Sequence, residues 1–507
     1  MTVKTRVVVD PLTRIEGHLR VEAVVDNGTV VEARSAGTLY RGFEQILRGR
    51  DPLDAVQLTQ RFCGVCPTAH AVASSQCLDH AFGIVPPDNG RIIRNLIQGA
   101  NYIQSHILHF YHLASLDFVR GPEFPPFVPR YEADYRLPKR TSDELLAHYV
   151  QALHIRLKAH EMSAVFSGKM PHCASVVPGG VTVTPTVDKV TTFLWRLREL
   201  RDFINNVYVP DVLSVAEVYR DYAEVGRGCG AFLSYGAFDL DNEPDVTKRS
   251  RFFAMGRCRG GAVEPVDPAR ITEDVRYSWY QSPSHQAPAA GDTIPDPAKA
   301  TAYSWLKAPR YDNAVYEVGP LARAAVGRAS GRNARLVKAI DEALATLRLT
   351  PEHLPSVVGR HLARALETQL VADSMADWVL QIKLDQAVAT PHVIPDEAQG
   401  CGLWDASRGA LGHWIAIRNK RIDRYQAVVP TTWNASPHDD RDQPGPMEQA
   451  LVGAPVKDPA NPFSLARIVR SFDPCIACAV HVLTPRGVVL QKIPLSPGPW
   501  VTQPNGS

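Results

Sequence analysis

Two Cys-x-x-Cys pairs near opposite ends of the chain are the residues whose types and spacing most clearly allow chemistry. The first pair is Cys63 and Cys66, and the second is Cys475 and Cys478. Each pair presents two soft thiolates at a spacing that can chelate a metal ion. Together the four thiolates predict one metal site.

The separation of these pairs along the chain indicates where the site lies. In a zinc ribbon the two pairs are about 15 to 20 residues apart and fold locally around the ion. Here nearly the whole chain separates them. Joining ends that are roughly twenty-fold further apart costs roughly 2 to 3 kcal/mol of additional loop-closure entropy, so a complete globular fold must supply the geometry. We therefore expect a central site rather than a local staple.

The composition is typical of a large soluble enzyme. Of the 507 residues, 45% are hydrophobic and 21% are charged, and the formal net charge is only +2. Such a balance offers no basic surface for nucleic acid. The first ten residues lack the apolar core and cleavage site of a secretory signal, and no run of about 18 apolar residues occurs. We expect a chain that neither spans a membrane nor carries its own export signal.

Cysteine usage points to reduced thiols. The chain has nine cysteines, an odd number scattered over its length, which argues against a disulfide framework. Those without paired spacing are more typical of small buried side chains, and they are Cys77, Cys173, Cys229, Cys258 and Cys401. Chemical use of cysteine is therefore assigned to the two pairs.

The segments that must position these pairs begin with β structure and continue with helices. Residues 6–31 alternate apolar and polar side chains around Asn27-Gly28, a strong signal for an antiparallel hairpin. Helical periodicity recurs, with two prolines interrupting the last segment, over residues 88–116, 141–165, 187–209 and 336–389. The sequence predicts an α+β fold with a mainly helical core.

Two segments rich in proline, aspartate, serine and glycine predict long loops. They span residues 282–300 and 436–447. This composition marks surface loops more readily than domain boundaries, and no low-complexity segment or repeat divides the chain. We expect residues 1–481 to form a single globule with internal subdomains.

The residues around the cysteine pairs resemble the two signature motifs of the nickel-iron hydrogenase large subunit. These motifs are Arg61-Phe-Cys-Gly-Val-Cys-Pro-Thr-Ala-His70 and Asp473-Pro-Cys-Ile-Ala-Cys-Ala-Val-His481. Further segments resemble the same family in order, and they are Arg14-Ile-Glu-Gly-His18, Arg41-Gly-Phe-Glu44, His109-Phe-Tyr-His112, Glu317-Val-Gly-Pro-Leu-Ala-Arg323, Arg408-Gly-Ala-Leu-Gly-His413 and Val429-Pro-Thr-Thr-Trp-Asn434. The resemblance covers residues 6–481 and implies an α+β fold with a long central helical bundle and peripheral antiparallel β structure.

The function implied by this resemblance is reversible oxidation of dihydrogen to protons and electrons by an uptake-type catalytic subunit. Heterolysis of dihydrogen needs a soft metal centre to hold hydride and a nearby base to take the proton, and thiolates serve both purposes. In the family pattern, Cys63 and Cys475 are terminal nickel ligands. Cys66 and Cys478 bridge nickel to an iron that carries carbon monoxide and cyanide. Spacing alone favours tetrahedral zinc at the same sulfurs, but zinc explains none of the surrounding motifs.

The resemblance also assigns roles to residues beside the cysteines. Glu16, otherwise typical of an exposed strand residue, relays protons outward from the terminal thiolate, and Cys475 is counted with it among the catalytic residues. Arg408 places its guanidinium over the open side of the metals, hydrogen-bonds a cyanide and takes part in splitting dihydrogen. Thr431 donates to the other cyanide, where the plain alternative is a turn threonine. His70 donates to a thiolate.

Three positions depart from the family pattern. Ser407 stands where many members have proline before the arginine, and Ser105 stands where they have aspartate before the His-x-x-His-Phe-Tyr-His segment. We expect Arg408 to lack one carboxylate partner and Asp473 to pair with it. Met170 stands where the best-known members have histidine, which bears on the subunit contact or the subgroup.

A second metal site is implied by the same resemblance. Glu44, His481 and the backbone carbonyl of Ala427 match the ligands of a structural magnesium, an ion that prefers oxygen ligands and retains water. On its own, Glu44 is typical of a solvated helix residue. Three histidines spaced by three residues are interpreted instead as core histidines, and they are His106, His109 and His112.

Residues 482–507 resemble the family's removable C-terminal extension. They are rich in proline and valine and have no metal-ligand pattern. The resemblance implies cleavage directly after His481 once nickel is inserted. Partners for this maturation are an endopeptidase and nickel chaperones.

Electrons must leave the site, yet no set of cysteines remains for iron–sulfur clusters. A partner must supply them. The resemblance implies a small subunit with those clusters, with onward transfer to a membrane cytochrome b or quinone pathway. It places the chain at the cell membrane through that subunit, on the periplasmic face if the partner is exported, with the cytoplasm as the alternative. Two other hypotheses stay open: a hydrogenase-like redox subunit lacking nickel, and a zinc-stabilised structural or interaction protein.

Overall fold

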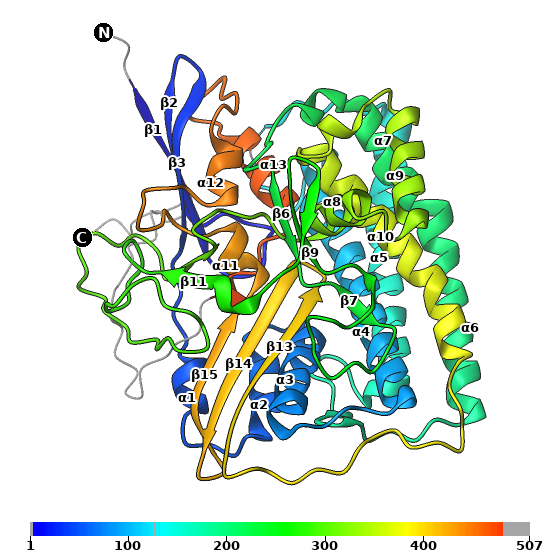
Figure 1. Cartoon of the computed structure of the whole chain (residues 1–507). Helices are drawn as coiled ribbons and strands as arrows, with labels where there is room; N and C mark the ends of the chain where they lie inside the picture. Colours follow the sequence, from blue (N-terminus) through cyan, green and yellow to red (C-terminus); the bar gives the residue numbers. More distant parts are fainter. Residues whose placement is uncertain (1–3, 126, 131, 480–507) are drawn as a thin grey trace, which may run out of the picture.

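The computed structural model describes residues 4–125, 127–130 and 132–479 as an α+β protein (Figure 1). Long helices occupy one side of the molecule and antiparallel strands the other (Figure 1). The predicted fold class is confirmed. The helices are α1 Phe43–Leu47, α2 Asp54–Thr59, α3 Pro67–Phe82, α4 Asp88–Leu108, α5 Lys139–Ser167, α6 Val187–Phe203, α7 Val209–Val218, α8 Pro320–Ala329, α9 Ala334–Thr346, α10 Val357–Val379, α11 Pro430–Asn434, α12 Pro446–Leu451, α13 Phe463–Ser471 and α14 Ile476–Ala479.

Helix α4 is the centre of the bundle. It packs against α3, α5 and α10, and nearly every side chain from Asn89 to Ile107 is buried. A helix buried on all sides belongs to the interior of a large protein. Beyond Leu108 the chain continues as a π-helix over His109–Ala114 and a 3-10 helix over Ser115–Asp117, so the helix predicted over 88–116 consists of three helical types.

Prolines divide the long helical segment predicted over residues 336–389. Helix α9 ends before Pro351, and α10 begins after Pro355. The side chain of Ser356 caps α10 by accepting a hydrogen bond from the Gly359 N–H at 3.0 Å. The predicted interruption is confirmed because proline cannot supply the backbone donor that an unbroken helix requires.

Two of the three three-stranded antiparallel sheets in the described residues carry most of the β structure. One has the order β1–β2–β3 and the other β13–β14–β15. Short antiparallel pairings cover the rest of this side. The strands are β1 Thr5–Val9, β2 Leu19–Asp26, β3 Thr29–Gly37, β4 Val176–Val177, β5 Gly180–Val181, β6 Ala231–Ser234, β7 Ala237–Asp239, β8 Arg251–Phe253, β9 Gly256–Arg259, β10 Ala262–Glu264, β11 Ile271–Asp274, β12 Ala308–Tyr311, β13 Glu397–Ala406, β14 Gly409–Arg418 and β15 Arg421–Val428.

The first sheet contains the predicted hairpin. Strands β2 and β3 turn at Asn27 and Gly28, whose φ angles are 50° and 75°. Both residues tolerate this left-handed conformation, which a two-residue hairpin turn requires. Alternate residues of β2 are fully buried, as its apolar spacing predicts.

The segment 436–447 differs from its prediction as a surface loop. It wraps the buried guanidinium of Arg310, which donates to Asp439 at 2.7 Å and to Ser436 Oγ at 3.1 Å. Loop composition therefore identified the absence of regular structure but not the burial. The other predicted loop, residues 282–300, is largely exposed as expected.

Helix α3 and strand β13 approach very closely, and this contact positions the first cysteine pair at the start of α3. A Cβ atom on Gly402 would lie 2.1 Å from the carbonyl oxygen of Ala73, and one on Gly400 would lie 2.3 Å from that of Cys77. Only glycine allows the helix backbone to rest directly on the strand.

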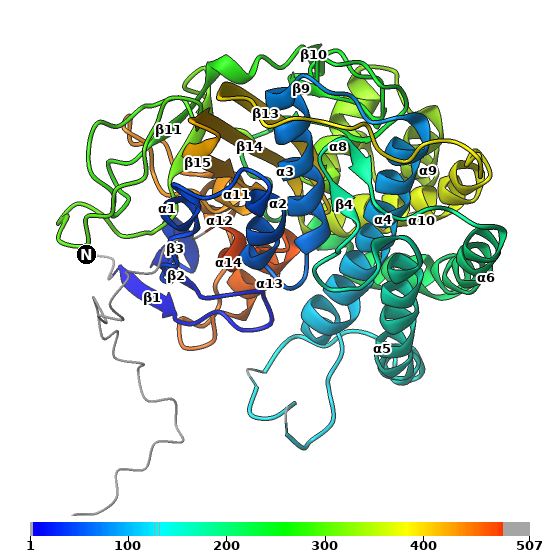
Figure 2. The ribbon, with the colours of Figure 1, turned by 90° about the horizontal axis from the view of Figure 1, so that it is seen from below.

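The last described residues return to the beginning of the chain. Glu16 forms a parallel bridge with Cys475, and the Ile476 N–H donates to the Glu16 carbonyl at 2.8 Å. Figure 2 shows α14 between the β1–β3 sheet and the α2–α3 segment. Glu16 lies outside the regular strands, so its interpretation as a strand residue is wrong. The two ends of the chain meet at the predicted metal site.

We predict that Gly402→Ala destabilises the fold, because its methyl group would meet the Ala73 carbonyl at 2.1 Å. Overpacking of this kind typically costs about 3 kcal/mol or less, and a rigid backbone contact lies at the upper end. Thermal unfolding measures the effect. The matched control is Gly327→Ala in α8, whose Cβ would lie 3.4 Å from the nearest atom. Equal midpoints for both variants would contradict the role of this contact.

Candidate metal centre

The four paired cysteines form one buried cluster. Their Sγ atoms are 3.2 Å apart for Cys63 and Cys475, and 3.1 Å apart for Cys66 and Cys478. The Sγ atoms of Cys475 and Cys478 are 2.9 Å apart. Among the described residues, this is the one group of at least three His, Cys, Asp or Glu side chains placed to hold a metal ion. The predicted convergence of the two pairs is thus present.

Local structure aims both pairs at the same point. Cys63 is extended, and Cys66 directly precedes α3, with Pro67 in the first turn. The N-terminus of a helix carries a partial positive charge that favours a nearby thiolate. The Val65 N–H also donates to the Cys63 sulfur at 3.1 Å. These features stabilise negative charge on the first pair.

The guanidinium of Arg41 joins the two cysteine loops. It donates to the carbonyl of Phe62 and to that of Ala477, the latter at 2.6 Å. One side chain therefore connects the residue before Cys63 to the residue before Cys478. In the sequence Arg41 is recognisable only as part of a motif, because its partners are backbone carbonyls that a sequence pattern does not reveal.

The protonation of the sulfurs fits a metal site. Burial opposes ionisation of Cys63, but hydrogen bonds from the other three thiols and the charge of Arg408 bring its pKa well below its ordinary value. Burial and the neighbouring thiols raise the pKa of Cys475 and Cys478 well above the ordinary range. Ionising all four sulfurs together requires further positive charge, which bound metal ions supply. The donor set is therefore suited to soft metal cations.

A buried arginine faces this cluster. Arg408 is 3% exposed, and its guanidinium donates from Nη2 to Asp473 Oδ1 at 2.9 Å and from Nε to the Asp473 carbonyl at 3.0 Å. Burial opposes its charge, but Asp473 and the sulfurs of Cys475, Cys66 and Cys63 raise its pKa well above the ordinary value. Arg408 is therefore a permanent cation beside the thiolates.

The two serines that depart from the family pattern lie together beneath this arginine. Arg408 Nη1 donates to Ser105 Oγ at 3.2 Å, and the Ser407 hydroxyl donates to the same oxygen at 3.1 Å. Hydroxyl groups thus lie beside Arg408 in place of the carboxylate partner that this arginine was expected to lack. The expected pair of Arg408 with Asp473 is present.

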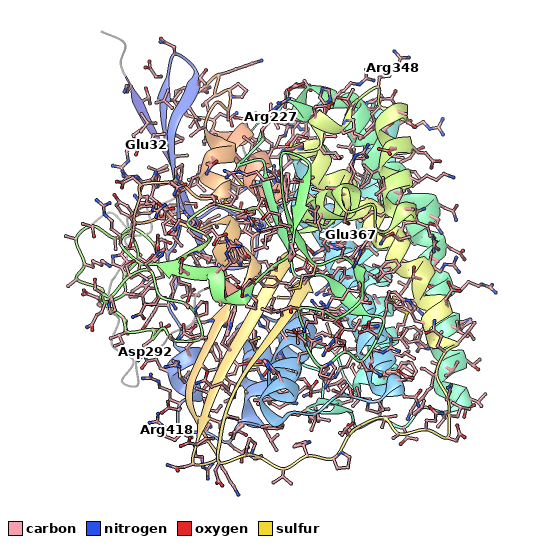
Figure 3. The ribbon with its side chains drawn as sticks, in the orientation of Figure 1. Glu32, Arg227, Asp292, Arg348, Glu367 and Arg418 are labelled. Atoms are coloured by element: carbon pink, nitrogen blue, oxygen red, sulfur yellow. The ribbon has the colours of Figure 1, made fainter. Side chains whose placement is uncertain are left out.

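A second buried arginine supports the turn that carries Arg408. Arg323 donates to the carbonyls of Ala406 and Ser407 at 3.0 and 2.8 Å. Its charge is balanced by Glu367, which lies inside the molecule in Figure 3, and by Asp405. A buried guanidinium paired in this way is rigid, because breaking the pair leaves an isolated charge. No sequence pattern indicates this role of Arg323.

Glu16 contacts the second cysteine pair. The Cys475 thiol donates to Glu16 Oε2 at 3.1 Å, and the Ala477 N–H donates to the same oxygen at 2.9 Å. Burial and the negative charge of Cys63 raise the pKa of Glu16 to about 7. A carboxyl with this pKa exchanges its proton readily near neutral pH.

Thr431 fixes the backbone at the cluster. Its Oγ1 accepts a hydrogen bond from the Cys475 N–H at 2.9 Å, and the side chain is buried in α11. The hydroxyl keeps its own hydrogen for a further acceptor. Thr431 is therefore not simply a turn threonine, because its hydroxyl makes a specific contact with the backbone of Cys475.

The predicted magnesium ligands are described only in part. Glu44 is 4% exposed rather than solvated, and its Oε1 accepts the Ala427 N–H at 3.1 Å. The nearby ammonium of Lys307 donates to Glu273 at 3.0 Å and to Gln426 at 2.8 Å. His481 lies outside the described residues. Glu44 and Ala427 are adjacent, as the predicted site requires.

The histidines divide between the core and the cluster. His106, His109 and His112 each make a hydrogen bond through Nε2, to Glu367, to the Arg470 carbonyl and to the Tyr149 carbonyl. They are absent from the metal-binding group found in the described part of the chain. His70 is 1% exposed. Burial lowers the pKa of His70 to about 4, although the negative charge of Cys63 acts in the opposite direction.

Comparison with known proteins identifies relatives of the whole chain. The family described as nickel-dependent hydrogenase matches residues 41–123 and 119–481, and the family described as HoxL-like matches residues 6–36. The chain is 44% identical to the periplasmic NiFeSe hydrogenase large subunit of Desulfomicrobium baculatum, with 95% of each chain covered. It is 35% identical to the quinone-reactive Ni/Fe-hydrogenase large chain of Wolinella succinogenes, with 97% of this chain and 98% of the relative covered.

A solved structure gives the same result. The Ni-Fe-Se hydrogenase of D. vulgaris Hildenborough in the reduced state is 45% identical and matches with a TM-score of 0.89. The match covers 94% of this chain and 100% of that chain. Fold and sequence likeness therefore extend over the same residues as the cysteine cluster and its surroundings.

We predict that Cys66→Ser prevents metal retention. A serine hydroxyl is a hard ligand and stays protonated, so nickel and iron should fall below about a tenth of their content in the unmodified protein. Elemental analysis of the purified protein measures this. Cys258→Ser is the matched control, because Cys258 is also buried but lies outside the cluster. Full metal content in the Cys66 variant would contradict the assignment.

Proposed function

The chain belongs to the nickel-dependent hydrogenase family as a catalytic large subunit, and we propose that it oxidises dihydrogen reversibly at a nickel–iron pair held by its four clustered cysteines. The observation that carries this proposal is the convergence of both thiolate pairs within 4.8 Å. We assign hydrogen uptake as the physiological direction. Relatives of this chain are named uptake hydrogenase large subunits.

The proposed ligand roles are those that the family resemblance implies for the four clustered cysteines. Cys63 and Cys475 would hold nickel, and Cys66 and Cys478 would supply sulfurs to both nickel and iron. When bound, the metal pair supplies a soft centre at which dihydrogen separates into hydride and proton equivalents. The carbon monoxide and cyanide ligands proposed for iron would be bound next to two side-chain donors. Arg408 offers N–H groups to one cyanide, and the Thr431 hydroxyl offers its hydrogen to the other.

The chain's own groups then handle the proton and its charge. The Cys475 sulfur accepts the proton, and Glu16 Oε2, 3.1 Å away, takes it onward. The Ala477 N–H holds that carboxylate oxygen in place. Arg408, fixed by Asp473, stabilises negative charge as it develops beside the sulfurs. Burial excludes bulk water from Cys475, Arg408 and Asp473, whereas Glu16 is partly exposed.

We predict that Glu16→Gln blocks proton exchange while the metals remain bound. Glutamine keeps the shape and can accept the Ala477 N–H, but it does not ionise. Exchange between dihydrogen and deuterated water should fall by at least about 100-fold, the contribution typical of a positioned acid–base group. Mass spectrometry of the gas phase measures it. Glu22→Gln, on β2 and paired with arginine at the surface, is the control that keeps its activity.

The outcomes of this experiment are distinct. Loss of exchange in the Glu16 variant alone supports the route. Wild-type exchange with Gln at position 16 would remove Glu16 from the path. If unmodified protein with nickel and iron bound shows no exchange, the proposed function itself fails.

We propose two further features for maturation and stability. Magnesium would be held by Glu44, the Ala427 carbonyl and His481, joining the end of the mature chain to β15 and α1. Cleavage after His481 by an endopeptidase, following nickel delivery by chaperones, would release residues 482–507. The burial of Glu44 beside Ala427 supports the magnesium site, since a buried carboxylate needs a cation or hydrogen-bond donors.

Large subunits of this family work with a small subunit, and we propose where this chain holds it. Electrons leave the cluster most directly at Cys63, where Arg61 and Gly64 are exposed. Met170 lies close to the start of α3, with its Sδ 3.6 Å from Thr68 Oγ1, and Lys169 precedes it in the chain. An iron–sulfur cluster on the partner must approach this surface.

Helix α5 carries an exposed apolar stripe. Val150, Leu153 and Leu157 are 57%, 52% and 54% exposed on one helical face. Phe124 is 58% exposed, and Phe127 links it to Tyr149 of α5 by ring contacts. An exposed apolar stripe of this kind marks a protein interface. The partner that fits it is the iron–sulfur small subunit.

We predict that the double variant Leu153→Glu and Leu157→Glu loses the small subunit. Each leucine contributes at least about 1.5 kcal/mol if buried in the interface, so affinity should fall by about 100-fold or more. Co-purification with a tagged small subunit measures it. Leu380→Glu, a 68% exposed leucine after α10, is the control. Retention of the small subunit by the double variant would contradict this docking surface.

The location proposed for the chain follows from its partner. No helix among the described residues is long and apolar enough to cross a membrane. One relative is named periplasmic and another quinone-reactive. We propose that the small subunit attaches this chain to the periplasmic side of the membrane and passes electrons to a cytochrome b or to quinone.

A further inference from the structure

A single buried aspartate connects the two segments whose contact the proposed proton route uses. Asp117 ends the 3-10 helix that follows the π-helix after α4, and it is 1% exposed. Its carboxylate oxygen Oδ1 accepts hydrogen bonds from Arg14 and from Arg470 Nη1, the latter at 2.6 Å. The proposed function gives no role to any of these three side chains.

Arg14 belongs to the segment that leads into Glu16. Besides its bond to Asp117, its guanidinium donates from Nη1 to the Leu113 carbonyl in the π-helix at 2.8 Å. The backbone of Arg14 has a φ of 55°, a left-handed conformation that residues with side chains rarely adopt and that persists where the surroundings impose it. The ion pair with Asp117 is therefore suited to hold this turn in place.

Arg470 contacts the same turn from the second segment. It lies on α13, and its Nε and Nη2 donate to the Thr13 carbonyl at 3.0 and 2.9 Å. Arg467, one turn earlier on α13, donates from Nε to the backbone carbonyl of Asp117 at 3.0 Å. These contacts fix the end of α13, from which the chain continues to Cys475.

The charges of this group depend on one another. Burial opposes the charge of Arg470 and lowers its pKa to about 10, whereas Asp117 acts in the opposite direction. Burial also opposes the charge of Asp117, but Arg14, Arg470 and Arg467 bring its pKa below the ordinary value. Arg467 has a second carboxylate partner in Asp134, while in the described part of the chain Arg14 and Arg470 pair with Asp117 alone. Without this carboxylate the two guanidinium groups would repel each other.

The two segments meet directly beyond this group. The Ile476 N–H donates to the Glu16 carbonyl at 2.8 Å. The Cys475 thiol and the Ala477 N–H donate to Glu16 Oε2 at 3.1 and 2.9 Å. The distance between the sulfur and the carboxyl therefore depends on how the two backbone segments are aligned.

We propose that Asp117 is a positioning residue for proton transfer from Cys475 to Glu16. Through Arg14 and Arg470 it aligns the Glu16 turn with the end of α13. In the transfer, the proton leaves the Cys475 sulfur, the bonding electron pair stays on sulfur, and an O–H bond forms at Glu16 Oε2. Asp117 acts through its arginines and not on the reacting atoms. The proposal rests on the proposed function, because it assumes that Glu16 takes this proton.

A small misalignment of the two segments would slow the transfer. Donor and acceptor must lie within about 3 Å of each other, and displacing a reacting group by about 1 Å can cost about 100-fold in rate. Replacing Asp117 with a neutral side chain leaves Arg14 and Arg470 without their common partner. We expect slower proton transfer, while binding of dihydrogen and of the metals stays unchanged.

The test uses Asp117→Asn in the complex of this chain with its small subunit. Turnover should fall by at least about tenfold with an unchanged KM for dihydrogen. The solvent deuterium isotope effect on turnover should rise, because proton transfer then limits the rate. Mass spectrometry should show faster hydrogen–deuterium exchange at the amides of Ile476 and Ala477. Arg14→Gln should give the same changes, and Arg14→Lys, which keeps the charge, should return turnover toward the unmodified value.

Asp239→Asn is the matched control. Asp239 is also buried and also pairs with two arginines, Arg249 and Arg251, both at 2.8 Å. Its replacement should lower the thermal midpoint, since it too leaves buried guanidinium groups without a partner. It should raise neither the isotope effect nor the exchange of the Ile476 and Ala477 amides.

The possible outcomes separate the two proposals. An unchanged isotope effect in both Asp117→Asn and Arg14→Gln, or an equal rise in Asp239→Asn, would overturn the positioning role. If Asp117→Asn does not yield folded protein, the two Arg14 variants decide the matter. Absence of turnover in the unmodified complex with nickel and iron bound would contradict the proposed function instead. Amide exchange then tests the alignment by itself, and unchanged exchange in the variants would overturn it.

Discussion

Four sulfur atoms that repel one another once ionised must share one buried space, and the rest of the structure is organised around this constraint. Cys63 and Cys475 are separated by 412 positions in the chain, yet their sulfurs are 3.2 Å apart. Buried negative charge is costly unless cations or hydrogen-bond donors compensate it. Part of that compensation comes from the N-terminus of α3, the Val65 N–H and Arg408. Bound metal ions would supply the rest. The fold brings them to one point from both ends of the chain.

The compensating groups are themselves held by buried pairs. Asp473 fixes Arg408 beside the sulfurs, and Arg323 fixes the turn beneath it through two backbone carbonyls. Pairs of this kind add little net stability, because desolvation offsets attraction. Their effect is to hold donors in position before the reaction begins, which is how preorganised charge assists catalysis. The same logic applies to the close contact of α3 with β13, which sets the position of the first cysteine pair.

Much of the site could be predicted from sequence because its signals are local. The spacing of the cysteines, the motifs around them and the periodicity of the long helices are all readable within short windows. Glu16 was misplaced in a strand because alternation continues through it, whereas Gly17, with φ of 86°, leaves the extended conformation to meet Ile476 and Ala477. The role of Arg323 could not be assigned because its partners, Glu367 and the carbonyls of Ala406 and Ser407, are distant in sequence. The loop 436–447 was misjudged since Arg310, which it encloses, lies over a hundred residues earlier.

X-ray absorption at the nickel edge tests the central claim, that the two cysteine pairs together bind a nickel–iron pair. The sample is the chain purified with its small subunit after maturation. The account predicts nickel surrounded by sulfur at about 2.3 Å, close to the length of other metal–thiolate bonds, with an iron neighbour that is lost together with nickel in Cys66→Ser. Zinc without nickel in that sample, or nickel bound only by nitrogen and oxygen, would contradict the account and favour a structural site.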